Sequence, residues 1–376
     1  MRATLLILCI FLAACSGNKT TEVYPDVAEP VTIAYAKGFR MSDYGGFIIL
    51  SILDVQDSTK ELHRYYLVRG EGAGYARLPE AQTIHIPVKK VAALSTTHIG
   101  FLMKLGEENS LGGFGGTKYI YADAVRKRAE QGEIQELNSG DQLNTELLVA
   151  LHPDVLFSYS TGNDAYDDQD KLSALRVHNV IISEFMETDP LGQAEWIKVF
   201  AAFYDKLDDG EKIFDSIVHA YTDLQHTVAN SKRPLVFTGL PFKGEWTIPG
   251  GKSFAAQFLS DAGAQYIWDA DKRTFNYPVS IETILHDAVD APFWLNADGA
   301  QSYADILDIE PRCVHLKAFT TKQVYNNDAR VGPAGGNDYW ESAVANPQDV
   351  LSDLIHIFHP EVCADSIMHY YKRMDK

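Results

Sequence analysis

The chain has 376 residues, of which 46% are hydrophobic and 22% charged, and its formal net charge is −18. This is the composition of an ordinary globular protein, and it excludes a chain that is mostly disordered, collagen-like or dense in disulfides. A strongly acidic chain repels phosphate backbones, so the charge argues against a nucleic-acid partner.

The N-terminus is typical of an exported protein. Arg2 precedes an apolar run over residues 3–14, which is shorter than the roughly 20 residues needed to span a bilayer. The run ends at Cys15, and the segment resembles a bacterial lipoprotein signal whose cysteine is lipidated and becomes the first mature residue. A plain signal peptide with an incidental cysteine is the alternative. We predict a signal peptide over residues 1–14 and a lipid-anchored polar tether over residues 15–30. The protein is then expected in the cell envelope, held by lipid in the outer or inner membrane and facing the periplasm.

Residues 31–90 are predicted to form a small β-rich extension. β-branched and aromatic runs alternate there with turn signals such as Tyr44-Gly45-Gly46. The expected strands cover residues 31–35, 47–53, 64–68 and 83–88.

From residue 91 the pattern changes to strands that alternate with helices, which is typical of parallel sheets covered by helices. A first α/β lobe is predicted over residues 91–190 and a second over residues 233–376. Residues 191–232 have a helical stripe of apolar side chains, and a continuous helix is expected over residues 208–231, before Pro234.

An internal echo supports two similar lobes. Glu146 opens a helix and Asp154 precedes the next strand, and Glu282 and Asp290 repeat this with the same spacing. The simplest architecture is an α/β fold with two Rossmann-like lobes joined by a single long helix, preceded by the small β-rich N-terminal extension.

Together these features resemble the substrate-binding proteins of ABC importers, in particular the group with one helical linker that serves ferric siderophores, haem and cobalamin. The resemblance covers about residues 88–376. Three segments carry it: Asn-Thr-Glu followed by a helix, Pro-Asp and a strand over residues 144–156, Pro-Val-Ser-Ile-Glu over residues 278–282, and Gly-Gly-Lys-Ser-Phe over residues 250–254.

The resemblance implies a docking role for two glutamates. One glutamate stands on top of each lobe in this family and meets an arginine of the membrane permease; by position these are Glu146 and Glu282. Exposed carboxylates at a rim steer and orient an encounter. The alternative is that each merely complements the dipole of a helix N-terminus.

A ligand is expected in the cleft between the lobes, on loops that follow the carboxyl ends of strands. The resemblance places Tyr159 and Tyr277 there, and flat aromatic side chains suit a large planar or chelated ligand. Ordinary core packing, or a solvated surface for the cation, is the alternative for each. Arg273 is a nearby cation that could pair with a carboxylate or phosphate of the ligand. The remaining candidates follow glycine-rich loops or the first strand of the second lobe: Tyr119, Tyr121, Phe242, Trp246 and Trp340.

The sequence motivates no catalytic residue, no bound metal and no resident cofactor. Gly251-Lys252-Ser253 lacks the earlier glycine of a phosphate loop, and no His-Glu-x-x-His or Gly-x-Ser-x-Gly is present. We therefore expect a monomeric binding protein, not an enzyme, that delivers a metal chelate or corrinoid to an ABC permease and its ATPase. A carrier of a bare transition-metal ion and a secreted enzyme on a similar scaffold stay open.

Overall fold

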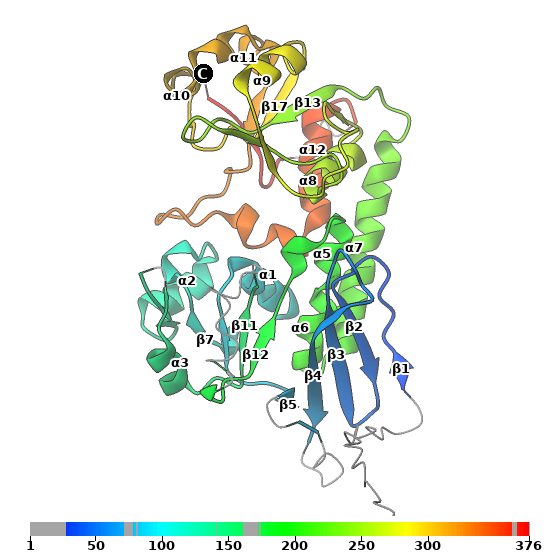
Figure 1. Cartoon of the computed structure of the whole chain (residues 1–376), viewed down its shortest axis with the longest axis vertical. Coiled ribbons are helices and arrows are strands. Elements are labelled where there is room, and N and C mark those ends of the chain that lie inside the picture. The colour runs from blue at the N-terminus through cyan, green and yellow to red at the C-terminus, as the bar shows by residue number, and fades with distance from the viewer. Residues whose placement is uncertain are drawn as a thin grey trace, which may run out of the picture.

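The computed structural model has two α/β lobes, one above the other in Figure 1, and a separate β-sheet beside the lower one. We call the lower lobe, whose sheet spans residues 91–181, lobe 1, and the upper lobe, whose sheet spans residues 235–373, lobe 2. The separate sheet is the N-terminal sheet. The predicted signal peptide and Cys15 lie outside the described residues. The structure describes residues 28–70, 78–79, 82–140, 142–160, 172, 174–362 and 367–375.

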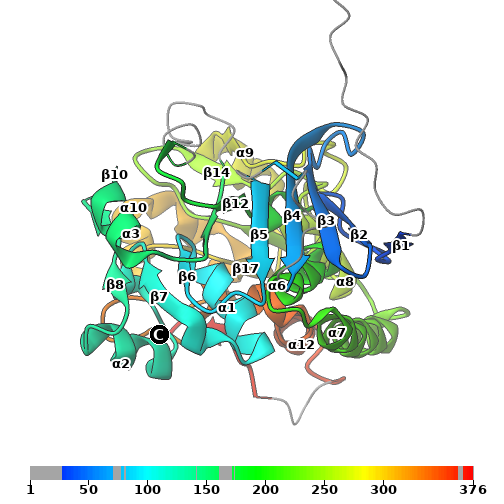
Figure 2. The ribbon, with the colours of Figure 1, turned by 90° about the horizontal axis from the view of Figure 1, so that it is seen from below.

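The N-terminal sheet confirms the β-rich extension. Its order is β1-β2-β3-β4-β5, antiparallel except for the parallel pair β4 and β5. Its apolar face packs on the helices that follow lobe 1, with Phe39 against Trp196 at 5.0 Å between ring centres. In Figure 2 the sheet lies beside α6 and α7, away from α2 and α3. The strands are β1 (Glu29–Pro30), β2 (Phe39–Asp43), β3 (Phe47–Leu53), β4 (Glu61–Arg69) and β5 (Thr83–Ile86).

The predicted strand at residues 31–35 is wrong, and β2 was not predicted. The backbone amides of Ala34, Tyr35 and Ala36 donate to the Glu195 carboxylate at 2.7–2.9 Å. The buried Glu195 side chain thus accepts the backbone N–H groups that would otherwise donate to a neighbouring strand.

Lobe 1 is built on the parallel sheet β12-β11-β6-β7-β8. Its central strands are buried on both faces, so they read as continuous apolar runs instead of alternating ones. The helix expected at Glu146 begins where the Asn144 side chain accepts from the Leu147 amide at 3.1 Å. The strands are β6 (Val91–Ala93), β7 (Leu111–Phe114), β8 (Gln135–Glu136), β11 (Val155–Ser158) and β12 (Asn179–Ile181), with the hairpin β9 (Asn138–Ser139) and β10 (Gln142–Leu143). The helices are α1 (Thr96–Leu105), α2 (Asp123–Glu130) and α3 (Thr145–Leu151).

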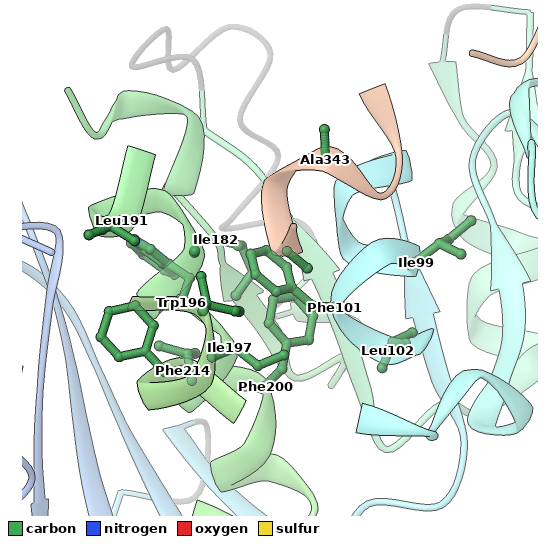
Figure 3. Packing of buried hydrophobic residues seen from close by; sticks show 14 of the residues in the cluster. Ile99, Phe101, Leu102, Ile182, Leu191, Trp196, Ile197, Phe200, Phe214 and Ala343 are labelled. Atoms are coloured by element: carbon green, nitrogen blue, oxygen red, sulfur yellow. The ribbon is translucent and has the colours of Figure 1, made fainter. Parts of the chain in front are cut away.

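Three helices lead from lobe 1 to lobe 2: α5 (Pro190–Glu195), α6 (Ile197–Phe203) and α7 (Leu207–Val228). Every residue of α6 is buried. The long helix predicted at residues 208–231 is α7, which runs along the side of both lobes in Figure 1. Figure 3 shows Phe200 of α6 against Phe101 of α1, at 4.9 Å between ring centres.

Lobe 2 is built on the sheet β15-β13-β17-β18-β19, parallel except for β19. Ser280 caps its helix α9 by accepting from the Thr283 amide at 3.1 Å, and Glu282 follows in the first turn. The strands are β13 (Leu235–Thr238), β15 (Gln265–Tyr266), β17 (Phe293–Leu295), β18 (Val324–Asn326) and β19 (Lys372–Arg373), with the outlying pair β14 (Trp246–Ile248) and β16 (Tyr277–Val279). The helices are α8 (Phe254–Asp261), α9 (Ile281–Asp287), α10 (Tyr303–Ile309), α11 (Lys317–Thr320) and α12 (Pro347–Phe358).

A second connection between the lobes was not predicted. Residues 331–346, the crossing segment, leave lobe 2 and pack on lobe 1, and α12 then returns alongside α7 (Figure 1). The Glu341 carboxylate accepts the backbone amides of Tyr121 and Ala122 at 2.7 and 2.8 Å. Ala343 lies above Phe101 in the core of lobe 1 (Figure 3). The lobes are therefore connected by the crossing segment as well as by α7, and the Glu341 side chain holds the crossing segment on lobe 1.

Candidate ligand-binding site

A cleft of about 1150 Å³ lies between the two lobes. Its lining comes from four parts of the chain: the lobe 1 segment 185–188, several loops of lobe 2 with the start of α8, the crossing segment at Tyr339 and Trp340, and the loops of the N-terminal sheet. Drug-sized ligands occupy about 300–1,000 Å³, so this cleft has room for a larger molecule.

One wall of the cleft is the carboxyl edge of the lobe 2 sheet. Gly239 follows β13, Asn296 and Asp298 follow β17, and Asn327 follows β18, and all four line the cleft. They meet because the carboxyl ends of parallel strands lie at one edge of a sheet. Burial, with a smaller contribution from the Asp328 carboxylate, raises the pKa of the Asp298 carboxyl to about 6. This wall therefore offers amide groups and a carboxyl group that is protonated more readily than an ordinary aspartate.

A loop over residues 271–276 forms the roof of the cleft and depends on the glycine pair of the Gly-Gly-Lys-Ser-Phe segment. A Cβ on Gly251 would lie within 3.0 Å of the carbonyl oxygens of Trp268, Asp271 and Asp269, so only glycine lets this loop pack so closely. The same approach holds Arg273 over the ring of Tyr277, 3.7 Å from its centre.

Exposed apolar side chains rim the cleft from both lobes. Phe185 and Met186 come from lobe 1, Phe275 from the roof loop, and Trp340 from the crossing segment. Each keeps 44–62% of its surface exposed. Large apolar side chains that stay exposed around a cavity mark a binding surface, because their exposure to water does not stabilise the fold of the protein alone.

The structure brings only some of the predicted ligand residues to this cleft. Arg273 and Trp340 line it. Tyr277 lies directly beneath Arg273, and the ring of Tyr159 meets Phe185 edge-on at 6.4 Å. These four residues stay candidates for ligand contact.

The described lining of the cleft does not include Tyr119, Tyr121 or Phe242. Tyr121 accepts a hydrogen bond from Arg330 at 3.2 Å, in a separate groove of about 470 Å³ between lobe 1 and the crossing segment. Tyr119 is half exposed beside Lys118, and Phe242 is exposed beside Lys243.

Trp246 is a correction. Its side chain is 1% exposed, it stacks near Trp294 and Phe237, and its indole nitrogen donates to the carbonyl of Thr238 at 3.0 Å. It is a core residue of lobe 2 and presents no face to a ligand. The sequence order placed it after a strand, but β14 and β16 turn its side chain inward.

Several lining residues escaped the sequence analysis. Phe275 lies two residues before the candidate Tyr277, and Asn296 directly follows a strand. Their positions in the sequence could therefore have identified both as candidates. Phe185 and Met186 carried no such signal. Lys37, Val55 and Gln56 belong to the N-terminal sheet, and no local pattern connects them with a cleft between two later lobes.

Glu184 is a buried carboxyl directly behind the rim residues Phe185 and Met186. Thr97 donates to its Oε1 at 2.6 Å, and its Oε2 has no hydrogen-bond partner among the described residues. Burial raises the pKa of this carboxyl from its ordinary 4.5 to about 7. The folded chain therefore holds a proton that the unfolded chain loses near pH 4.5. The stabilising contribution is complete below that pH and disappears as the pH rises through 7.

Substitution of Glu184→Gln is expected to flatten this pH dependence. Between pH 5 and 8 the variant should gain stability relative to the parent chain, by at most about 3 kcal/mol, since each pKa unit corresponds to about 1.4 kcal/mol. Urea unfolding at both pH values measures the difference in the free energy of unfolding between the variant and the parent chain. Glu130→Gln, on the exposed face of α2, is the control. The prediction is contradicted if the difference in the free energy of unfolding between Glu184→Gln and the parent chain is the same at both pH values.

The two candidate docking glutamates stand on exposed first turns of α3 and α9. Glu146 is exposed to solvent. Glu282 is 71% exposed and pairs with Arg312 at 2.8 Å, and Arg312 also holds Glu310 at 2.8 Å. The backbone amide of Glu282 and the Arg312 guanidinium lower the pKa of the Glu282 carboxyl, so it is ionised at neutral pH.

Within the described residues, no group of three His, Cys, Asp or Glu side chains is arranged to hold a metal ion. None of the described helices combines the length and the apolar character that a membrane-spanning helix needs.

Most of the chain matches a known protein family. A family model described as periplasmic binding protein matches residues 91–331, which begins at the first strand of lobe 1. A lipoprotein of Methanocaldococcus jannaschii is 24% identical over 299 residues, covering 77% of this chain and 70% of the relative.

Solved structures share the two-lobed fold. A periplasmic haem-binding protein from Pseudomonas aeruginosa superposes with a TM-score of 0.56 at 17% identity, covering 73% of this chain and 93% of that one. The periplasmic vitamin B12 binding protein of Vibrio cholerae superposes with a TM-score of 0.52 at 15% identity, covering 74% and 99%. At these identities the likeness concerns the fold.

Proposed function

The chain belongs to the periplasmic binding protein family, and on that premise we propose that it is the substrate-binding lipoprotein of an ABC importer. It captures an iron chelate or corrinoid, of the ferric-siderophore, haem or cobalamin class, in the cleft between its lobes. It then delivers this ligand to the permease, and the partner ATPase supplies the energy. The protein acts as a monomer and performs no chemistry on its ligand.

The cleft is the observation that carries this proposal. Its volume of about 1150 Å³ exceeds what a small metabolite or a bare ion needs. Its rim gathers exposed aromatic rings from both lobes, Phe185, Phe275 and Trp340, which suit the flat or bulky apolar surface of a chelate. Arg273 adds a cation held over an aromatic ring at the roof.

Docking is assigned to Glu146 and Glu282. Both are exposed at the start of a helix, one on each lobe, so both carboxylates are accessible to cations of a partner. The Arg312 contact of Glu282 is a surface ion pair, worth little by itself, and can be exchanged for a permease cation.

Anchoring through Cys15 accompanies this role. The name of the M. jannaschii relative, a lipoprotein, supports an exported protein tied to the membrane by lipid. A lipid anchor keeps the binding protein near its permease in the cell envelope and raises the local concentration for docking.

The test is binding of a ligand panel to the full chain, purified in detergent. Fluorescence of its five tryptophans is followed against cobalamin, cobinamide, haem, several ferric siderophores and free divalent metals, with thermal shift as a second readout. Saturable binding of one chelate is expected. Binding of free metal alone would support an ion carrier, and no binding across the panel would contradict the proposal and favour an enzyme.

A further inference from the structure

The N-terminal sheet reaches the ligand cleft. Lys37 precedes β2, and Val55 and Gln56 lie in the turn between β3 and β4; all three line the cleft together with both lobes. In Figure 1 these loops rise at the upper end of the N-terminal sheet, toward α8 of lobe 2. The family model begins at residue 91, so this wall lies outside the matched part of the chain.

This wall is fixed to lobe 1 by buried carboxylates. The Glu187 carboxylate accepts the backbone amides of Lys37 and Gly38 at 2.9 and 2.8 Å and the indole nitrogen of Trp196 at 3.2 Å. A Cβ on Gly38 would come within 2.8 Å of the Trp196 ring, so the loop follows the surface of lobe 1 closely. Lys37 therefore projects from a backbone position that lobe 1 determines.

Two of the three acidic residues of the lining are already engaged. Glu187 is buried and receives three donors. Asp271 accepts the backbone amide of Arg273 at 2.8 Å and lies 3.6 Å from its guanidinium. The third, Asp298, has a pKa of about 6 because of burial and the Asp328 carboxylate, so it is protonated more readily than an ordinary aspartate but is mostly ionised at pH 7.

The lysines of the lining, Lys37 and Lys272, form no ion pair with another residue in the described part of the chain. Both lysines are exposed, although the charge of Lys37 acts on the Glu187 carboxylate. Lys37 comes from the lobe 1 side of the cleft and Lys272 from the roof loop of lobe 2. Two exposed lysines outside any described ion pair thus line one cavity in a chain whose net charge is −18.

We infer that the N-terminal sheet is a third wall of the binding site, and that Lys37, together with Lys272, binds a carboxylate, phosphate or catecholate oxygen of an anionic chelate. This inference rests on the proposed function and narrows it to anionic ligands. A charge-assisted hydrogen bond from a lysine is roughly twice as strong as a neutral one and discriminates by charge. The third wall gives the ligand a contact that the two lobes alone do not supply.

The test compares Lys37→Gln and Lys37→Glu with the parent chain, using haem, ferric citrate, an anionic ferric tris-catecholate and a cationic ferric tris-hydroxamate as probes. For whichever anionic probe binds, Lys37→Gln should raise the Kd by about 5- to 20-fold and Lys37→Glu by more. Lys232→Gln and Lys232→Glu are matched controls, because Lys232 is exposed after α7 and does not line the cleft. Thermal unfolding of each variant verifies that the fold is retained.

The outcomes separate this inference from the proposed function. If no anionic probe binds the parent chain, the inference is overturned, and the proposed function falls with it only if cobalamin and cobinamide also fail to bind. If an anionic chelate binds but its Kd is the same in the Lys37 variants as in the Lys232 controls, the third wall is refuted and the proposed function stands. Tighter binding of the cationic complex than of every anionic one also refutes the inference.

Discussion

Reversing the charge of both Glu146 and Glu282 to lysine is expected to abolish ligand uptake while ligand binding stays unchanged. Both side chains are exposed at helix starts on different lobes, and neither lines the cleft. A lysine in either place meets a permease arginine with like charge, which costs several kcal/mol at an interface, so uptake should fall at least about tenfold. Each single variant should show a smaller loss. Uptake of labelled ligand by cells and Kd of the purified protein measure the two effects separately.

Glu130→Lys combined with Glu133→Lys is the matched control, because it changes the net charge equally at exposed positions of lobe 1 away from both helix starts. Arg312→Gln provides a second comparison, since it frees Glu282 from its surface ion pair without removing the carboxylate. We expect this variant to retain uptake. Normal uptake by the double reversal would show that the two glutamates serve only their own helices.

The largest loss of stability is expected from Lys198→Met. Lys198 lies in α6, and its ammonium donates to Glu195 Oε1 at 2.9 Å and to the carbonyl of Thr32 at 2.8 Å. Both side chains of the pair are at most 5% exposed. Removing one partner leaves a charge buried without compensation, which costs about 3–5 kcal/mol. Urea unfolding should register this loss, and the N-terminal segment should become more susceptible to limited proteolysis.

Two further variants distinguish charge from packing. Lys212→Met, at an exposed position of α7, should change the free energy of unfolding by less than about 0.5 kcal/mol. Adding Glu195→Gln to Lys198→Met removes the uncompensated charge but keeps an oxygen that accepts the amides of residues 34–36. The double variant is therefore expected to recover part of the loss. No recovery would mean that packing, not charge, dominates.

The local signals in the sequence were good guides to individual elements. Glu146 and Glu282 were each expected to open a helix, and they lie in the first turns of α3 and α9, which Asn144 and Ser280 cap. Apolar runs predicted the buried parallel strands, and the helical stripe predicted α7. These features depend on hydrogen bonds and burial within a few residues of one another, so the sequence displays them directly.

The candidate site was less accessible to sequence analysis. Trp340 was selected because it follows a glycine-rich loop and Arg273 because it is a cation near the expected cleft, and both line the cleft. Trp246 was selected because it follows a strand, and it is buried. The direction in which the Trp246 side chain points depends on the pairing of β14 with β16, in which Trp246 lies opposite Val279, which is 279 − 246 = 33 positions later in the chain.

The sequence by itself determined the fold class, the export signal expected at the N-terminus and the two exposed glutamates. Only the tertiary structure decided that the N-terminal sheet faces the cleft and that the crossing segment returns to lobe 1. Ala34 meets a carboxylate 161 positions away, and Tyr121 meets one 220 positions away. No local sequence pattern identifies the partners in such contacts. A buried carboxylate needs hydrogen-bond donors, and the fold supplies backbone amides that lie far away in the sequence.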